Sequence, residues 1–215
     1  VTRRIACLFL LILTGVISPY WVFSQSISSL DSLSIVEVLP DESYSLNPHL
    51  QVYVDSTGTQ SLDDARDHAT WLSYGPVSTQ IPRGSVLWGV LRLYSKADDT
   101  TSWALELGNI DFIDVSLNDK EEVLHSGVLS LVDKRNVQIG RKASVRLQLP
   151  PHEITSVWIR MEEKRSHPPV PRIVPVEWND WRTQILLFEW REFAFLGLFI
   201  GILLIMLCYN LIIYL

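Results

Sequence analysis

Large aromatic and basic side chains alternate with aliphatic ones along two segments of this chain, and the combination is one that can bind sugars. If both segments are β-strands, residues of one parity lie on one face of a sheet. Flat aromatic rings pack on the C–H faces of pyranose rings, while guanidinium groups donate hydrogen bonds to hydroxyls. We interpret these side chains as a ligand-binding platform made by Trp88, Arg92, Tyr94, Trp158 and Arg160.

The platform interpretation predicts that both of its indole rings are partly exposed. Leucines oppose Trp88 on its segment, and aliphatic side chains have the better claim to a core. Two buried arginines would need partners, which the sequence does not place nearby. The alternative is that the rings pack under a loop or against a membrane-proximal region. Two further tryptophans, Trp71 and Trp103, are expected in the core.

The acidic and histidine residues form no recognisable metal-binding pattern. Aspartates cluster within residues 63–67, 98–99 and 111–114, but no twelve-residue calcium loop is present. The five histidines have neither HxH nor HxxxH spacing, which argues against zinc. We interpret the aspartates as solvated turn and helix-start residues, with a bound calcium ion as the alternative, and we predict no cofactor.

Charge and motifs argue against nucleic-acid binding and catalysis. The 215 residues carry a formal net charge of -6, so a broad cationic surface for phosphate contacts is not expected. The sequence has no serine elbow, phosphate loop or dinucleotide fingerprint. A glycosidase needs two carboxylates across a cleft, which a sequence cannot show. We predict no enzymatic activity and no catalytic residues in this chain.

Short alternating segments between turn residues predict an all-β fold, an antiparallel jelly-roll-like β-sandwich. One short helix is expected to start near Ser61, which has capping-box spacing to Asp64. The expected strands are residues 35–39, 50–54, 86–94, 103–107, 112–117, 123–125, 145–149, 157–161 and 173–176. Alternation predicts an inner layer of Trp103, Leu105, Leu107, Ile113, Val115, Leu117, Val145, Leu147 and Leu149.

Both ends of the chain are apolar. Arg3 and Arg4 precede a short apolar run and then small residues, which is typical of a secretory signal peptide; an uncleaved anchor is the alternative. Residues 193–215 contain no Asp, Glu, Lys, Arg or His. As a helix they extend over about 34 Å, enough for a hydrocarbon core of roughly 30 Å. The alternative is a buried helix of a soluble protein.

These features divide the chain into five expected parts. They are a signal peptide (1–24), a Ser-rich tether (25–34), an extracytoplasmic β-sandwich sensor domain (35–177), a juxtamembrane amphipathic helix (178–192) and a transmembrane helix (193–215). All 24 acidic residues lie between Asp31 and Glu192, and such a segment is allowed on the outer face of a membrane. Cys7 and Cys208 both lie outside the β domain, which must fold without a disulfide.

The apolar helix carries three residues that suit helix packing. Gly197 and Gly201 form a GxxxG pair, which lets another helix approach closely. Packing within a larger bundle and formation of a homodimer are both open. Asn210 is polar and deep in the span, so we expect it to face protein. At the other end of this region, Asn179 is a plausible helix cap.

The order of several segments resembles one family of receptors. The matching segments are Leu50–Asp55 with Gly58 and Ser61–Asp64, then Trp88–Tyr94, Trp103–Asn109, Asp111–Leu117, Gly127 with Arg135, and Phe195–Leu215. They are similar to the bacterial seven-transmembrane receptors with diverse intracellular signalling modules, 7TMR-DISM, and to their second type of extracellular domain. Val128 stands where an acidic residue is usual in the family, and Gly89 and Val90 stand where a bulkier pair is usual.

The resemblance implies a jelly-roll, carbohydrate-binding-like sensor followed by the first of seven membrane helices. It implies Arg135 as a further ligand contact. It also implies a cytoplasmic output, such as a histidine kinase or diguanylate cyclase, beyond residue 215. Expected partners are the lipid bilayer of the bacterial inner membrane and a carbohydrate or other small periplasmic ligand. The competing function is a structural or protein-interaction module at the cell surface with no small ligand.

Overall fold

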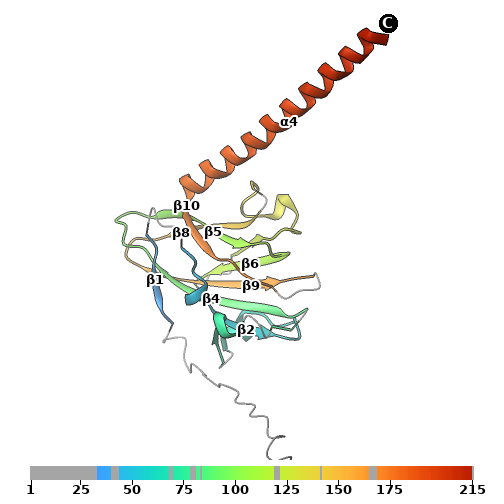
Figure 1. The fold of residues 1–215 in the computed structure, drawn as a ribbon. Helices are drawn as coiled ribbons and strands as arrows, with labels where there is room; N and C mark the ends of the chain where they lie inside the picture. The colour runs from blue at the N-terminus through green and yellow to red at the C-terminus, as the bar shows by residue number, and fades with distance from the viewer. Residues whose placement is uncertain are drawn as a thin grey trace, which may run out of the picture.

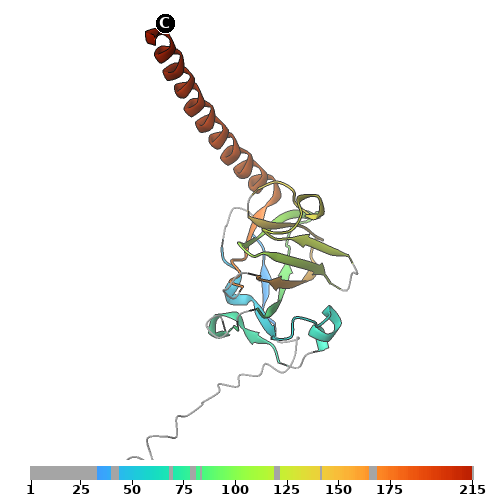
Figure 2. The same cartoon turned by 90° about the vertical axis from the view of Figure 1, so that its right-hand side faces the viewer.

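The computed structural model describes residues 33–39, 44–67, 70–77, 81–82, 84–118, 122–140, 142–164 and 169–214. The expected signal peptide, most of the expected tether and the last residue of the expected transmembrane helix lie outside these ranges. The described part consists of a β domain, from one end of which a single long helix projects (Figures 1 and 2).

The strands and helices alternate irregularly along the chain. The strands are β1 (Ile35–Glu37), β2 (Gln51–Asp55), β3 (Leu72–Ser73), β4 (Val86–Tyr94), β5 (Thr101–Gly108), β6 (Phe112–Leu117), β7 (Val123–Ser126), β8 (Ala143–Leu149), β9 (Ile154–Glu162) and β10 (Val174–Glu177). The helices are α2 (Leu62–Asp67), α3 (Tyr74–Val77) and α4 (Trp178–Tyr214), with short 3-10 turns η2 (Asn47–His49) and η3 (Val132–Lys134).

Two sheets form the domain. The larger sheet has the order β3-β2-β4-β9-β6-β7, and β1 joins it by pairing with β4. β1 and β2 follow one another along β4, since β2 pairs with residues 86–90 and β1 with residues 92–94. β1 runs parallel to β4, and the other pairings are antiparallel. The smaller sheet has the order β10-β5-β8. The predicted antiparallel β-sandwich class is confirmed.

The main core lies between the two sheets. All nine residues predicted for the inner layer belong to this cluster or pack against it, from Trp103 on β5 to Leu149 on β8. β4 and β9, which pair over nine residues, contribute their leucines, Val157, Ile159 and Met161 to the same cluster. Gly89 interrupts the bulky run of β4 because a Cβ there would lie 3.0 Å from Leu50 and 3.2 Å from Met161.

A second cluster covers the outer face of the larger sheet. Val86, Trp88 and Val90 of β4 and Trp158 of β9 lie there beneath Ala65 of α2 and Trp71. Trp71 is 3% exposed and makes an edge-to-face contact with Trp158 at 5.7 Å between ring centroids. Both faces of β4 are therefore buried, one between the sheets and one under the segment that contains α2.

The C-terminal helix is continuous. α4 follows β10 without a connecting loop and runs unbroken from Trp178 to Tyr214, so the expected juxtamembrane and transmembrane helices are one element. It begins one residue before Asn179, the expected cap. Its most apolar stretch has a mean hydropathy of 2.6 and none of it is buried, as in a helix that crosses a membrane.

Candidate functional site

The outer face of the smaller sheet carries the start of α4. Alternation turns Ser102, Ala104 and Glu106 of β5 outward, and the register places Arg146 of β8 opposite Ala104. On this face Ala104 and Val137 form a third buried cluster with Trp181, the fourth residue of α4. Because Ala104 has only a methyl group, the indole of Trp181 can lie directly on the sheet, where it is 2% exposed.

Polar contacts fix this helix on the sheet. The indole N–H of Trp181 donates to Glu106 Oε1 at 3.1 Å. Lys142 Nζ, from the segment before β8, donates to the other carboxylate oxygen of Glu106 at 3.1 Å. A half-buried carboxylate with two such donors keeps its charge compensated. Glu106 therefore joins the helix, the central strand of the smaller sheet and the approach to β8.

Arg146 makes a second link between the sheet and the helix. Its guanidinium carbon lies 4.6 Å from the centroid of the Trp178 ring, a cation–π contact. Its Nη2 donates to Ser102 Oγ at 3.2 Å. Trp178 also stacks on Trp181, with 5.2 Å between centroids and 19° between planes. The first turn of α4 is thus held by aromatic stacking and by one arginine from β8.

A cleft of about 680 Å³ opens beside this junction. Its volume is within the range of small-molecule sites, roughly 300–1,000 Å³. Its wall comes from the chain just after β1, the segment between β4 and β5, the outer sheet face, and the end of β10 with the start of α4. The lining residues are Val38, Leu39, Ser95, Lys96, Ala97, Thr100, Thr101, Ser102, Trp103, Arg146, Glu177, Trp178 and Asn179.

Hydrogen bonds inside the cleft orient several of its polar groups. Thr101 Oγ1 accepts the indole N–H of Trp103 at 2.9 Å and lies 3.3 Å from Ser95 Oγ. Lys96, on the rim, pairs with Glu37 of β1. Hydroxyls, an amide and charges of both signs therefore face the space. Such groups can recognise a small polar molecule by hydrogen bonding.

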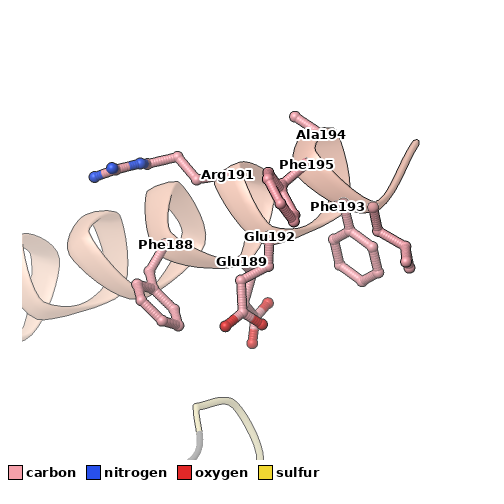
Figure 3. A pocket seen from close by; sticks show the side chains of 8 residues that line it. Phe188, Glu189, Arg191, Glu192, Phe193, Ala194 and Phe195 are labelled. Atoms are coloured by element: carbon pink, nitrogen blue, oxygen red, sulfur yellow. The ribbon is translucent and has the colours of Figure 1, made fainter. Parts of the chain in front are cut away.

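Two other hollows differ in kind. One of about 290 Å³ lies on the other side of Arg146 and is lined by Leu117, Glu122, Leu124, Asn136, Arg146 and Gln148. The second, of about 990 Å³, is lined by residues of α4 alone, namely Phe188, Glu189 and Arg191–Leu196. Figure 3 shows Arg191 pointing away from one side of that helix and Glu189 and Glu192 from the other. These side chains surround a helix and do not enclose a ligand.

The predicted exposure of the tryptophan platform is wrong. Trp88 is 5% exposed and Trp158 is 7% exposed. The predicted sheet face of both side chains is correct, since both rings lie on the face opposite the main core. The helix predicted near Ser61 is present as α2, but its position over this sheet face was not predicted. Trp71 packs on Trp158, and the Arg66 guanidinium lies 5.2 Å from the Trp158 ring centroid. The alternative, rings packed under a loop or against a membrane-proximal region, is correct in that the rings are covered, but the cover includes the helix α2.

The other three residues of the predicted platform are half-buried, and none of them lines the cleft: Arg92, Tyr94 and Arg160. Arg160 pairs with Glu162 at 3.1 Å and with Asp114 at 3.7 Å, so the expectation that no partner lies nearby is also wrong. β6 pairing with β9 places Asp114 directly opposite Arg160. Burial would raise the pKa of Glu162, but Lys164 and Arg160 outweigh it and hold that pKa below its usual value.

Tyr94 and Arg92 pair with β1 residues through their backbone.

Arg135 organises a loop. It donates to the carbonyls of Val128 at 2.8 Å and Ser130 at 3.0 Å. The loop starts at Gly127, whose φ of 119° disfavours other residues, and a Cβ there would lie 2.3 Å from the Asp111 carbonyl oxygen. The segment from Gly127 to Arg135 is therefore a loop that is closed at both ends. A contact between Arg135 and a ligand stays a prediction.

The helix-packing residues lie on the exposed length of α4. Neither Gly197 nor Gly201 has another atom within 4 Å of an added Cβ, so the described chain leaves this face open. Asn210 Nδ2 donates to the Met206 carbonyl of the same helix at 2.9 Å, which satisfies part of the amide internally. Within the ranges that the structure describes, no three His, Cys, Asp or Glu side chains gather as a metal site.

Sequence reasoning missed the junction itself. Arg146 alternates with the predicted inner-layer residues Val145 and Leu147, and a helix was expected from residue 178; the structure places both accordingly. The cleft combines segments near residues 38, 95–103, 146 and 177–179, and no local spacing connects them. The one available signal was the absence of turn residues between the last predicted strand and the helix, which implies that the helix starts on the sheet.

Comparison with known families agrees with the architecture. No curated protein matches the chain. The family model for 7TMR-DISM extracellular 2 matches residues 47–172, which is more than half of the chain and runs from η2 to just before β10. With its terminal apolar helix, this β-sandwich belongs to the 7TMR-DISM extracellular 2 family, the extracellular domains of 7TMR-DISM receptors.

Proposed function

We propose that this domain senses a small polar ligand outside the membrane and that the ligand binds in the cleft where the sandwich meets α4. The observation that carries the proposal is the origin of the cleft wall: Ser102 and Arg146 come from the sheet, while Trp178 and Asn179 belong to the helix. A ligand in this space contacts the domain and the helix together.

Contact with both parts is what a sensor requires. A ligand shifts a conformational equilibrium only by the difference in its affinity for the two states. If the helix moves relative to the smaller sheet, the contacts available in the cleft change, and so does the affinity. Since β10 continues directly into α4, no flexible linker absorbs such a movement. The domain binds, and catalytic output, such as a histidine kinase or diguanylate cyclase, belongs to other parts of the receptor.

The chemistry of the wall favours carbohydrates or similarly hydroxylated molecules. Ser95, Thr100, Thr101 and Ser102 supply hydroxyls, and Asn179 supplies an amide. The Trp178 ring is already engaged by Trp181 and Arg146, so ring stacking on a sugar is not the main contact here. Recognition relies on hydrogen bonds instead. We place the receptor in a bacterial inner membrane with this domain in the periplasm or outside the cell.

Ligand screening on the full chain in lipid nanodiscs tests this function. A panel of neutral and acidic saccharides is scored by the thermal shift that each produces. Ser102→Phe fills the cleft, while Gln148→Phe, opposite Ser102 in the register, adds the same ring at the smaller hollow. We expect stabilisation by a panel member that Ser102→Phe abolishes and Gln148→Phe keeps. A panel without any stabilising member, or one whose effect survives Ser102→Phe, overturns the proposal in favour of a protein-interaction module.

A further inference from the structure

The loop between β7 and β8 exposes three aliphatic side chains within four positions. Leu129 is 54% exposed, Leu131 is 62% and Val132 is 56%. Single apolar residues are ordinary on protein surfaces, but a local group of this kind marks a contact with a partner or a membrane. The cleft at the start of α4 does not include any of the three.

The loop backbone is fixed in this conformation. Val128 and Leu129 donate to the carbonyls of Ile110 and Asp111 at 2.8 and 3.0 Å, which anchors one end. Arg135 holds the carbonyls of Val128 and Ser130, and Asn136 N donates to the His125 carbonyl at 2.8 Å, which closes the other end. The aliphatic side chains are thus presented by an ordered loop.

The loop lies at the end of the domain from which α4 leaves. Val137 and Ile139, which follow it, pack with Trp181 and Ile185 of the helix. A Cβ on Gly140 would lie 3.5 Å from Ile185 Cδ1. Both views show the yellow segment at the end of the domain from which the helix leaves (Figures 1 and 2). The exposed group therefore sits on the same side of the domain as the apolar length of α4.

The length of the helix places the bilayer close to this loop. Ile185 precedes Phe193, where the uncharged stretch begins, by eight residues, or about 12 Å of helix. The headgroup layer accounts for roughly 5–8 Å on each side of a bilayer. An ordinary helix tilt of about 20° brings one side of the domain nearer still. Asp133 and Lys134, which follow the aliphatic group, are both exposed and carry opposite charges, so it is the aliphatic side chains that favour a lipid surface.

We propose that Leu129, Leu131 and Val132 insert into the headgroup–acyl boundary of the bilayer that α4 crosses. The loop is then a second membrane contact, and together with the helix it sets the tilt of the domain. The inference rests on α4 as a membrane span and is independent of the ligand cleft. The occupant is a lipid surface, which the adjoining apolar helix already requires on this side.

The test uses the full chain in nanodiscs with Cys7→Ala and Cys208→Ala, so that one new cysteine carries an environment-sensitive fluorophore. The label is placed by Leu131→Cys or, as the matched site, by Val170→Cys. Val170 is 61% exposed and precedes the end of β10 that is opposite to the end continuing into α4. Lipids with a nitroxide at the headgroup or shallow on the acyl chain are the quenchers. We expect at least two-fold more quenching at position 131 than at position 170.

A second variant separates lipid contact from mere proximity. In the Leu131→Cys background, Leu129→Gln with Val132→Gln should reduce the quenching at least two-fold, while Ile154→Gln, on β9, should leave it unchanged. Circular dichroism confirms that each variant is folded. Equal quenching at positions 131 and 170 overturns the proposal. A label at 131 that is shielded from water but not quenched by lipid also overturns it, in favour of a protein partner or a second copy of the chain.

Discussion

The guanidinium of Arg146, on β8, lies over the ring of Trp178, the first residue of α4, at 4.6 Å from its centroid. The same guanidinium donates to Ser102 on β5. One exposed arginine therefore connects two strands of the smaller sheet to the start of the apolar helix. It also lines the cleft on one side and the smaller hollow on the other, so a ligand in either space meets this contact.

Arg146→Ala should loosen the start of α4 and leave the sandwich folded. The change removes a cation–π contact and an exposed hydrogen bond, together about 1–2 kcal/mol. Hydrogen exchange should speed up at the amides of residues 180–183 by roughly ten-fold, the equivalent of 1.4 kcal/mol. Lys134→Ala, an exposed cation on the neighbouring loop, is the control and should change nothing there. Unchanged exchange in Arg146→Ala would mean that the apolar packing of Trp181 and Ile185 holds the helix without Arg146.

Trp158→Ala should unfold or strongly destabilise the domain, because the ring is buried between Trp71 and the larger sheet. Removing a buried aromatic side chain costs about 3–5 kcal/mol. Chemical denaturation of the full chain in nanodiscs, followed by near-ultraviolet circular dichroism, measures the loss. Leu39→Ala, at a position that is 39% exposed, gives the baseline for a surface change. A loss below about 1 kcal/mol for Trp158→Ala would contradict the burial described here.

Gly127→Ala should be among the most harmful small substitutions in the chain. The added Cβ would meet the Asp111 carbonyl oxygen at 2.3 Å, and φ is 119°. Strain in such a backbone region costs about 1–3 kcal/mol before the clash is counted. Gly75→Ala is the matched control, because nothing lies within 4 Å of its added Cβ. The midpoint temperature of thermal unfolding should fall clearly for Gly127→Ala and by little for Gly75→Ala. Equal shifts of the midpoint would contradict the loop geometry.

Acid should lower the free energy of unfolding of the domain, in part because Asp55 becomes protonated. Burial would raise the pKa of this carboxylate, but hydrogen bonds from the Thr57 hydroxyl and from the amides of Gln60, Thr57 and Gly58 hold it below its ordinary value of 3.8. Because the folded-state pKa is the lower one, the stabilisation is present above pH 3.8 and is lost as the pH falls through the folded-state pKa. Asp55→Asn should lower the stability at neutral pH and flatten its acid dependence below pH 4, as measured by denaturation across pH. An unchanged acid slope would assign the effect to other carboxylates.

Strand positions and faces were predictable because alternation is a local property. β4 and β6 match the predicted bounds, and Leu105, Ile113 and Val145 lie in the core as their parity requires. Alternation cannot show what covers the second face of a sheet. Trp158 faces away from the core as predicted, yet α2 and Trp71, from a region far earlier in the chain, bury it.

The candidate site was less predictable for the same physical reason. Ser102, Arg146 and Trp178 carry ordinary local signals, and only the register of β5 with β8 and the direct passage from β10 into α4 bring them together. β3 has two residues, too few for a periodic pattern to reveal. Contacts between distant segments decide such features, and a single sequence does not encode them in any local spacing.

Hydrogen exchange of residues 178–183 with and without ligand measures the coupling between the cleft and the apolar helix. The full chain in nanodiscs is compared with and without a saccharide that stabilises it, in the wild type and in Arg146→Ala. We predict that the saccharide changes exchange at the start of α4 by at least several-fold and that Arg146→Ala reduces this response. A bound saccharide that alters exchange only on the larger sheet, and leaves residues 178–183 unchanged, would contradict the claim that ligand binding and the membrane helix are coupled at this junction.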